Sequence, residues 1–445
     1  MDPAYTRISA IDPDARKEDI VRSYVETYPM LIEADPDAWR GKFRKMAGSP
    51  FAFYRGSAAL FYRDIQGGDD DPFLNDRTSR VWIQGDLHCD NFGTYMNSAG
   101  VLVFDVNDFD ESYVGAFTWD LKRLAASLAL LGYQKALADD AISRMIETVL
   151  RSYARQVQRF AAGETESDFA LTLATTDGIL RDILGAARLQ TRLAMLEQFT
   201  TIESFDRRFG GSDGSMHRLD STTQADVDDA FQAYLETIPE SKRDRRLSYR
   251  AKDTVGRRGV GIGSAGLPSY NVLLEGHTQA LENDIIVYMK QSIPAAPRLA
   301  VPDERVRTYF HDDAERTVIS QRALQAYADP WLGNTTLHGA GYLVAEASPY
   351  TTDLDWGDLN DLDQILQLLT YLGQAVAKIH CVSDVDSDQT LVPFSTDQAI
   401  AEVLAGREDE FVSHVVGFGH GYGAVARRDY ELFVDAFRNG TIAGL

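Results

Sequence analysis

Cysteine is scarce in this sequence, with only Cys89 and Cys381 among 445 residues. Neither has another cysteine or a histidine at zinc-ligand spacing, and the distance between them argues against a disulfide framework. Such usage is typical of a reducing compartment, so we expect a cytoplasmic protein. Long apolar runs are also missing, and the first twenty residues are polar and acidic. We therefore expect neither a membrane span nor a targeting peptide.

Positive charge is in the minority. The chain has 44 Lys and Arg against 67 Asp and Glu, which gives a formal net charge of −23. Such a charge repels nucleic acid and anionic membranes, so we expect neither as a partner. A cationic substrate or a salt-rich habitat is compatible with it, although solubility alone is the ordinary explanation. The composition carries no information on the oligomeric state.

Hydrophobic periodicity predicts an α+β protein with a helix-rich body and one small sheet-bearing lobe. Helical spacing dominates both ends of the chain, whereas glycine and β-branched residues concentrate between them. We divide the chain into an N-terminal helical segment (1–80), a hairpin with a candidate catalytic loop and following helices (81–164), a helical insertion (165–250), a sheet with a glycine-rich loop (251–350) and C-terminal helices that complete the helical lobe (351–445).

The stretch QGDLHCDNFG, residues 84–93, concentrates acceptor side chains between two apolar segments. Residues 91–95 and 101–106 have strand character and are joined by the turn residues NSAG, which predicts a hairpin. The hairpin would bring together four oxygen-bearing side chains, namely Asp86, Asn91, Asp105 and Asp108. Such a cluster suits a hard cation such as Mg²⁺, which prefers oxygen ligands and keeps water for substrate phosphates.

GDLHCDN resembles the catalytic loop G-D-x-H-x-x-N of aminoglycoside-phosphotransferase-like kinases, and NDFDES…TWDLKRL is similar to their metal-binding segment and the helix after it. The resemblance implies that Asp86 is the catalytic base or aligner, that Asn91 and Asp108 hold Mg²⁺, and that Asp120 braces the loop. The spacing from Asp108 to Asp120 fits the family pattern better than the spacing from Asp105. Gln84 departs from that pattern, which usually has His there.

The chain also resembles an uncharacterised bacterial domain-of-unknown-function family in its motifs FYRG, GDxHxxNFG, NDFDE and WDLKRLAAS. This resemblance covers most of the chain. The family is grouped distantly with kinase-like folds, which implies a two-lobed fold with a helix-rich C-lobe and a small antiparallel N-lobe sheet.

A glycine-rich stretch, GVGIGSAGLPSYNVLLEG, contains Gly261-x-Gly263-x-x-Gly266. Its glycines would let backbone amides cradle phosphates, with Ser264 adding a hydroxyl. A dinucleotide-binding fold requires a helix directly afterwards, but a second strand follows here. A kinase-type loop is followed by a strand and then by a strand that bears a lysine, which Lys290 supplies at the end of the run DIIVYMK. A solvated lysine at a strand end is the alternative.

Further predictions concern residues that would act with this lysine. A later helix should offer a carboxylate to orient Lys290, and Glu315 is the best candidate, with Glu304 a second possibility. The stretch GYLVAEASPYT resembles the connector that contacts adenine. His380, in the helix YLGQAVAKIHCVSD, is expected to be structural. Arg55, amid aromatic residues, is either a phosphate contact or a salt bridge to the catalytic loop.

The order of the motifs is unusual, because the Asp86 loop precedes the glycine-rich loop along the chain. A circular permutation of a kinase-like fold would reconcile this order with the resemblance. The sequence thus predicts an enzyme that binds ATP and Mg²⁺ and phosphorylates an unidentified small molecule or protein.

Three other functions remain open. Nucleotidyl (AMP) transfer could use the same fold. A metal-dependent phosphoesterase also begins with GDLH, but its later histidine motifs have only poor counterparts here. A non-catalytic nucleotide-binding protein would be indicated by the loss of Asp86, Asn91 or Lys290, and all three are present.

Overall fold

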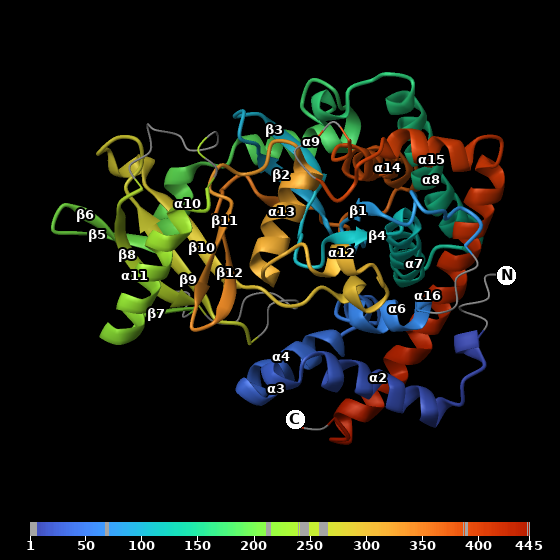
Figure 1. Cartoon of the computed structure of the whole chain (residues 1–445), viewed down its shortest axis with the longest axis horizontal. Helices are drawn as coiled ribbons and strands as arrows, with labels where there is room; N and C mark the ends of the chain where they lie inside the picture. The colour runs from blue at the N-terminus through green and yellow to red at the C-terminus, as the bar shows by residue number, and fades with distance from the viewer. Residues whose placement is uncertain are drawn as a thin grey trace.

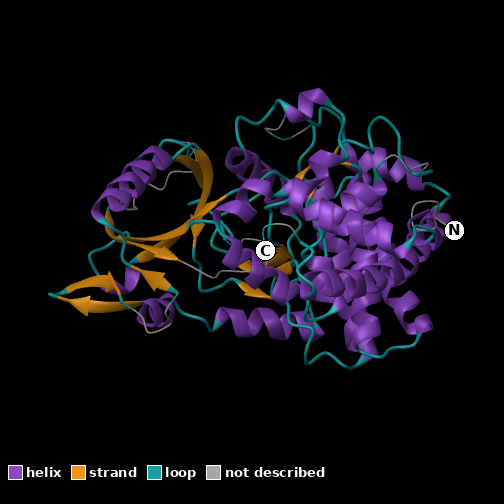
Figure 2. Cartoon of the chain, turned by 90° about the horizontal axis from the view of Figure 1, so that it is seen from below, coloured by secondary structure: helices purple, strands orange, loops and turns teal. Residues whose placement is uncertain are grey.

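The computed structural model describes residues 7–66, 71–210, 215–238, 240, 249–257, 266–385, 387, 390–442 and 444. The strands of the largest sheet lie on one side of the molecule, and most of the helices gather on the other (Figures 1 and 2). All the strand pairs in the described ranges are antiparallel. The predicted α+β class is therefore confirmed.

The largest sheet has six strands in the order β11-β12-β10-β9-β8-β7. Their bounds are β7 (Met216–His217), β8 (Ala251–Arg257), β9 (Ser269–Leu274), β10 (Ile285–Gln291), β11 (Gly333–Leu337) and β12 (Ala340–Glu346). Alternation along β10 sends Val287 and Met289 to one face, against α11 (Ser221–Leu235), and Tyr288 to the other, against α13 (Asp313–Gln325). Helices therefore cover both faces of this sheet, and α10 (Arg192–Phe199) also packs on the face of Tyr288 through Leu196.

The helical body is built around five long or central helices. They are α7 (Phe117–Gln134), α8 (Asp139–Ala161), α14 (Leu362–Cys381), α15 (Thr396–Leu404) and α16 (Glu408–Arg438). A Cβ at Gly373 would lie 2.3 Å from the carbonyl oxygen of Val149, so α14 and α8 approach too closely to admit a side chain there. Leu128, Ile146 and Leu372 belong to the apolar core of this body.

Five N-terminal helices pack beside α16 at the base of the molecule in Figure 1. They are α2 (Pro13–Thr27), α3 (Pro29–Ala34), α4 (Pro36–Met46), α5 (Pro50–Arg55) and α6 (Ala58–Ile65). Pro occupies the first helical position of the first four, where a missing N–H costs nothing. Tyr24, Phe43, Phe53 and Phe433 form the aromatic centre of this packing.

Two small sheets position the acidic loops. One joins β1 (Val81–Ile83) to β4 (Tyr113–Gly115), and the other joins β13 (Thr352–Asp353), β2 (Phe92–Met96) and β3 (Leu102–Val106). The hairpin predicted from the NSAG turn is confirmed as the β2–β3 pair. The loop between β1 and β2 and the loop between β3 and β4 consequently lie next to each other.

The segment 165–250, predicted as a helical insertion, is only partly helical. It contains α9 (Gly178–Arg188), α10 (Arg192–Phe199), α11, the hairpin β5 (Thr200–Glu203) with β6 (Asp206–Phe209), and β7. Periodicity missed the strands because they are short and polar. The remaining elements are α12 (Glu304–Arg307) and the 3₁₀ turns η1 (Glu166–Asp168), η3 (Leu281–Asn283) and η4 (Ala296–Leu299).

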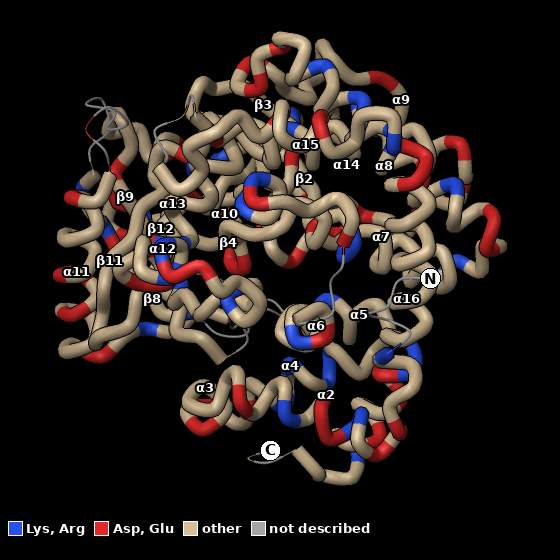
Figure 3. The backbone as a smooth tube through the Cα atoms, turned by 45° about the vertical axis from the view of Figure 1, so that its right-hand side comes forward, with Lys and Arg blue, Asp and Glu red and all other residues tan. Residues whose placement is uncertain are grey.

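Figure 3 shows Asp and Glu interspersed with Lys and Arg over both the sheet side and the helical side. None of the helices in the described ranges combines the length and apolar character needed to cross a membrane.

Candidate functional site

A cavity of about 580 Å³ lies where the large sheet meets the two acidic loops. The sheet contributes Tyr288 and Lys290 from β10 and their cross-strand partners Ala345 and Leu343 from β12. The loops contribute acceptor side chains, among them Asn91, Asp108 and Asp110, and α13 contributes Thr317, Gln321 and Gln325. Residues nearly two hundred positions apart in the sequence therefore line one space.

Asp120 of α7 supports the loop between β1 and β2 through hydrogen bonds to its backbone. The backbone N–H groups of Gln84 and Gly85 donate to the two carboxylate oxygens of Asp120, at 2.7 and 2.9 Å. His380 Nε2 lies 3.2 Å from the same carboxylate, and the hydroxyl of Tyr153 lies 2.9 Å from His380 Nδ1. All these side chains are buried. The expected structural roles of Asp120 and His380 are confirmed.

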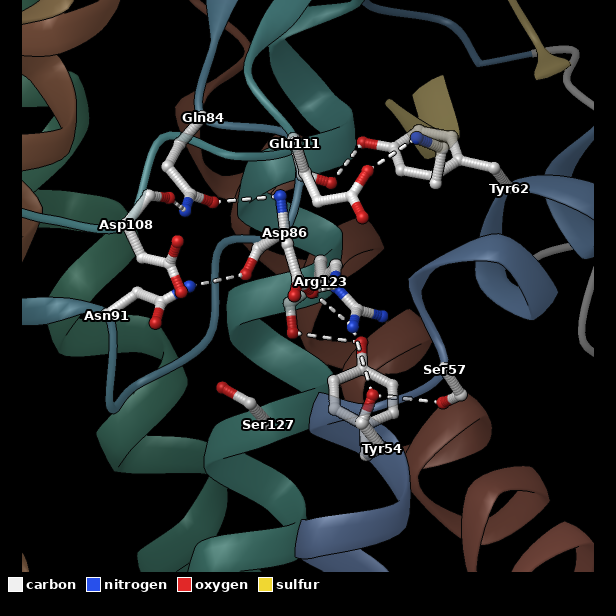
Figure 4. A network of polar contacts seen from close by, with 12 residues as sticks. Tyr54, Ser57, Tyr62, Gln84, Asp86, Asn91, Asp108, Glu111, Arg123 and Ser127 are labelled. Carbon is white, nitrogen blue, oxygen red and sulfur yellow. Dashed lines mark hydrogen bonds and ion pairs between the residues drawn. The ribbon is translucent and has the colours of Figure 1, made fainter. Parts of the chain in front are cut away.

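Asp86 is paired with Arg123, one turn of α7 beyond Asp120 (Figure 4). The guanidinium of Arg123 is fully buried, lies over the ring of Tyr54 and donates to the carbonyl oxygen of Tyr54 at 3.0 Å. Burial raises the pKa of Asp86, and the charge of Arg123 opposes that rise. The side chain of Asp86 is 16% exposed, and Asp86 is not among the residues that line the cavity.

Asn91 and Asp108 line the cavity together, and their side chains project into the same space in Figure 4. The side-chain amide of Asn91 donates to the backbone carbonyl of Asp86 at 3.0 Å, which leaves its carbonyl oxygen to face the cavity. Asp108 has φ of 56°, a conformation that non-glycine residues rarely adopt. Burial and the nearby charge of Asp110 raise the pKa of Asp108 to about 6.

Gln84 joins the two acidic loops. Its side-chain oxygen accepts from the N–H of Asp86 at 2.8 Å, and its side-chain nitrogen donates to the carbonyl oxygen of Asp108. The position that usually holds His in phosphotransferases thus has a clear structural role here, because an amide can accept from one loop and donate to the other.

Lys290 is paired with Asp110 rather than with the predicted Glu315. Burial lowers the pKa of Lys290. The carboxylates of Asp110 and Asp108 raise it by a larger amount, so the pKa of Lys290 is raised overall. Glu315 instead accepts from the backbone N–H of His311, while Asp312 accepts from the N–H of Glu315 at 2.8 Å. These two bonds cap the N-terminus of α13, and Glu315 does not line the cavity. The predicted pairing was wrong because Glu315 is engaged by the backbone N–H and the ring of His311, beside the N-cap residue Asp312.

Asp105 does not join the other oxygen ligands, so its prediction as a metal ligand is corrected. Its carboxylate is paired with the buried amine of Lys378 from α14, which also donates to the carbonyl oxygen of Leu324 at 2.9 Å. Asp105 lines a different, smaller cavity of about 270 Å³. It belongs to β3, whereas Asp108 follows the end of that strand, so the two side chains diverge.

Arg55 forms a salt bridge of 2.9 Å with Asp90, and both side chains line the cavity. The salt-bridge alternative is thus observed, with Asp90 of the catalytic loop as the partner of Arg55. Arg257, at the end of β8, also lines the cavity, and its Nε has no hydrogen-bond partner within the described part of the chain.

Of the glycine-rich loop, Gly261, Gly263 and Ser264 lie outside the described residues. Gly266 is described, has φ of 79° and lies against α4 instead of lining the cavity. The neighbouring Leu267 and Ser269 do line it. Both ends of this β8–β9 connection, including Arg257, therefore reach the cavity.

Sequence reasoning missed Arg123, Asp110 and Glu111. Arg123 stands three residues after Asp120 on a predicted helix, and this spacing could have indicated a shared face. Glu111 accepts a hydrogen bond from the N–H of Ala296, and burial together with the charge of Asp86 raises its pKa to about 7. Asp110 and Glu111 continue the acidic run NDFDE, so no local signal separated them from surface carboxylates.

The donor set facing the cavity suits a hard cation that takes few protein ligands. In the described ranges no three His, Cys, Asp or Glu side chains cluster as metal ligands. Mg²⁺, however, is commonly held by one or two protein oxygens together with substrate phosphates and water. The amide oxygen of Asn91 and the carboxylate of Asp108, both at the cavity, offer such a pair.

No curated protein and no solved structure matches this chain significantly. The model of one protein family matches residues 34–436, which is most of the chain. The chain therefore belongs to the family described as an uncharacterized protein conserved in bacteria (DUF2252).

Proposed function

We propose that this protein is an ATP- and Mg²⁺-dependent phosphotransferase with a circularly permuted, two-lobed kinase-like fold. The observation that carries the proposal is the shared cavity of Lys290, Asn91 and Asp108. Lys290 and its partner Asp110 are 180 positions apart, so no local sequence constraint brings them together. A lysine on a strand opposite an Asn and an Asp is the arrangement that kinases use for phosphates and their metal.

The topology around Lys290 supports the same proposal. β8, the glycine-rich connection, β9 and the lysine-bearing β10 follow one another, and then come α13, β11 and β12. A protein kinase has its glycine-rich loop, its lysine strand and its αC helix in this order. Residues 346–348, the last residue of β12 and the two that follow it, line the cavity, where the adenine-binding connector is expected.

The contacts of α14 support the permutation. The stretch YLGQAVAKIHCVSD, which ends α14, resembles the phosphotransferase helix L-x-x-x-L-A-x-x-H, which normally leads into the catalytic loop. Here α14 ends at Cys381, far downstream of that loop, yet His380 contacts the carboxylate of Asp120 that braces the loop. The two parts are thus neighbours in space although their order along the chain is exchanged.

In the proposed reaction each residue has a defined task. Asp86, fixed by Arg123, accepts the proton of an acceptor hydroxyl or orients that hydroxyl toward the phosphate. Lys290 binds phosphate oxygens, and Asn91 and Asp108 would hold Mg²⁺, which neutralises the negative charge of the phosphates when bound. Arg257, at the end of β8, offers a further cation to the phosphates.

One difference from protein kinases concerns the partner of the lysine. Kinases pair it with a glutamate of αC, whereas Lys290 pairs with Asp110 from the loop that also carries Asp108. Asp110 would hold Lys290 close to the metal-binding carboxylate before the nucleotide arrives. Nucleotidyl transfer would use the same residues. A separate measurement must therefore identify which group of ATP is transferred. The phosphoesterase alternative gains no support, because His88 is buried and contacts the ring of Phe51 instead of the cavity.

Calorimetry with ATP, ADP and NAD, with and without Mg²⁺, tests the proposal. We expect ATP to bind more tightly with Mg²⁺, and Lys290→Ala and Asp108→Ala each to weaken that binding about tenfold or more, because each removes a charge-assisted contact. Asp229→Ala, on the exposed side of α11, is the control and should bind like the wild type. Absence of Mg²⁺-dependent ATP binding, or binding unaffected by Asp108→Ala, would contradict the proposal. Product analysis with radiolabelled ATP then distinguishes phosphoryl from nucleotidyl transfer.

A further inference from the structure

A second cavity, of about 270 Å³, lies between the hairpin β2–β3, the C-terminal end of α13 and the helix α14. α14 contacts both β3 and α13, and the three elements are neighbours in Figure 1. Residues 167–171, which follow α8 in the chain, close a further side. The main cavity, which Lys290 lines, is a different space. Among the described residues only Tyr95 and Gln325 line both.

Most of the wall of the second cavity is apolar. It is formed by Val103 of β3, Leu171 and Ala375, which are buried, and by Phe169. Val101, which is 43% exposed, marks the mouth of the cavity. An engineered cavity of about 150 Å³ with walls of this kind binds benzene. The second cavity is larger, so it has room for a molecule with two fused rings.

One ion pair interrupts this apolar wall. Lys378 of α14 and Asp105 of β3 both line the second cavity, are paired with each other, and are at most 8% exposed. Because their charges cancel, a charged ligand would leave one charge without a partner in a region of low dielectric. The exposed Asp168, also in the lining, further disfavours an anion. The second cavity therefore favours an uncharged ligand.

The ion pair retains capacity for further hydrogen bonds. The ammonium group of Lys378 has three N–H donors, of which one faces Asp105 and one donates to the carbonyl oxygen of Leu324 at 2.9 Å. Asp105 accepts from Lys378 and from the N–H of Val106 at 2.9 Å, whereas a carboxylate has about four acceptor positions. A donor and an acceptor thus lie side by side, and a hydroxyl group satisfies both because it donates and accepts.

The wall shared by the two cavities contains a strained turn. Ala326, directly after α13, has φ of 52° and ψ of −56°, and the N–H of Tyr327 donates to the carbonyl oxygen of Gln325. This is a γ-turn of the rare form in which the central residue has positive φ. The bond from Lys378 to Leu324 holds the turn on one side, and the N–H of Ser98 donates to the carbonyl oxygen of Tyr327 at 3.3 Å on the other. Such strain persists only where the surrounding structure imposes it, and it gathers at ligand sites.

Gln325 connects this turn to the main cavity. Its side-chain oxygen accepts from the side-chain amide of Gln321 at 3.1 Å, and Gln321 lines the main cavity. Gln325 itself and Tyr95 line both cavities. A ligand in the second cavity would therefore contact side chains that a ligand in the main cavity also contacts.

We propose that the second cavity is an effector site, which binds an uncharged aromatic alcohol of two fused rings and alters nucleotide binding in the main cavity through Gln325 and Tyr95. The hydroxyl of the ligand accepts from Lys378 and donates to Asp105, and its rings pack against the apolar wall. The site and its ligand are argued from the second cavity alone, whereas the effect on the nucleotide rests on the proposed function.

2-Naphthol is the probe for this site, because it has two fused rings and one hydroxyl and is uncharged at neutral pH. Calorimetry with the wild type should show a single saturable site. 2-Naphthoate has the same rings and a negative charge, and it should bind at least about tenfold more weakly. This comparison uses the unmodified chain, so it does not depend on how a variant folds.

Two variants locate the bound probe. Ala375→Leu extends a side chain into the second cavity and Val101→Trp fills its mouth, so each should weaken 2-naphthol binding about tenfold or more. Because Val101 is at the surface, its substitution leaves the packing of the core unchanged. Ala424→Leu, at an exposed position of α16, is the control for Ala375→Leu and should change the affinity by less than about twofold.

A further titration measures the coupling between the two cavities. Saturating ATP with Mg²⁺ should change the affinity for 2-naphthol about fivefold or more, and 2-naphthol should change the affinity for ATP by the same factor, because coupling between two sites is reciprocal.

The outcomes separate the site, its effect and the proposed function. The site is overturned if the wild type does not bind 2-naphthol, if 2-naphthoate binds equally well, or if both cavity variants bind 2-naphthol like the wild type. ATP that binds without altering the affinity for 2-naphthol overturns the effector role alone. If 2-naphthol binds and ATP does not, the proposed function is wrong and the effector role fails with it, while the ligand site stands.

Discussion

Glu111 shows how burial at this site alters the titration of single residues. Its pKa is raised from its usual 4.5 to about 7, first by burial and then by the charge of Asp86. Asp108 and Asp329 both line the cavity. Burial and the carboxylate of Asp110 raise the pKa of Asp108 to about 6, and burial and the carboxylate of Glu346 raise the pKa of Asp329 to about 7. Each of these groups holds its proton more tightly in the folded protein than in the unfolded chain.

This shift predicts that folding stability declines as the pH rises. Between about pH 4.5 and 7 the unfolded chain has already lost the proton of Glu111, whereas the folded protein retains it, so deprotonation favours unfolding. Glu111→Gln should remove part of the decline, on the order of 2 kcal/mol between pH 5 and pH 8, measured by urea unfolding.

The exposed Glu282 supplies the control, because Glu282→Gln should leave the pH dependence of the wild type unchanged. A wild-type stability that rises from pH 5 to pH 8, or a Glu111→Gln profile parallel to that of the wild type, would contradict the raised pKa of Glu111.

At the scale of elements, α13 connects the sheet to the acidic loops. Arg316 donates to the carbonyl oxygens of Ser112 and Asp110, at 2.7 and 2.8 Å, and Thr317 and Gln321 line the cavity. At the start of the helix the N-cap residue Asp312 accepts from the N–H of Glu315, and Glu315 accepts from the N–H of His311. Its orientation depends on these contacts and not on an ion pair with Lys290.

Two variants distinguish the capping role of Glu315 from a role in nucleotide binding. Glu315→Ala should lower the free energy of unfolding by about 1 kcal/mol and leave Mg²⁺-ATP affinity unchanged. Asp110→Ala should weaken that affinity severalfold, because it frees Lys290 from the carboxylate that holds it at the cavity. Denaturant titrations and calorimetry check both effects, and a loss of ATP affinity in Glu315→Ala would restore the original assignment.

At the scale of the whole molecule, Arg16 joins the beginning of the described chain to its last long helix. Its guanidinium donates to Asp64 of α6 at 2.6 Å and to Asp429 of α16 at 3.1 Å, and Tyr422 donates to Asp64 at 2.7 Å. The three charged side chains are almost completely buried. α2 is thereby fixed against α16.

Removal of this arginine should be strongly destabilising. We expect Arg16→Met to lower the free energy of unfolding by about 3–5 kcal/mol, because it leaves the buried carboxylate of Asp64 without a cation and leaves Asp429 with only the longer ion pair to Arg428, at 3.7 Å. Lys17→Met, on the partly exposed side of the same helix, should change it by less than about 1 kcal/mol. Adding Asp64→Asn and Asp429→Asn to Arg16→Met should recover part of the loss. Thermal and urea unfolding measure these differences, and a near-neutral Arg16→Met would show that the cluster is not a structural link.

The sequence by itself determined the features that depend on neighbouring residues. The period-2 segments on either side of NSAG fixed the β2–β3 hairpin, and the short spacing of Asp86 and Asn91 kept them in one loop. The helical spacing after residue 117 and the family motif together indicated that Asp120 would support this loop. Such features are encoded by backbone geometry over a few residues, so the sequence shows them directly.

Only the tertiary structure decided which distant side chains meet. The partners of Asp86, Lys290 and Asp105 are Arg123, Asp110 and Lys378, and none of these ion pairs was predicted. An ion pair between separate elements depends on the packing of whole helices against strands and on the direction in which each side chain leaves its backbone. Many carboxylates and amines in an acidic chain could form the same kind of ion pair, so composition and spacing could not identify the partners. The packing of the large sheet against the helical body brought these particular side chains together.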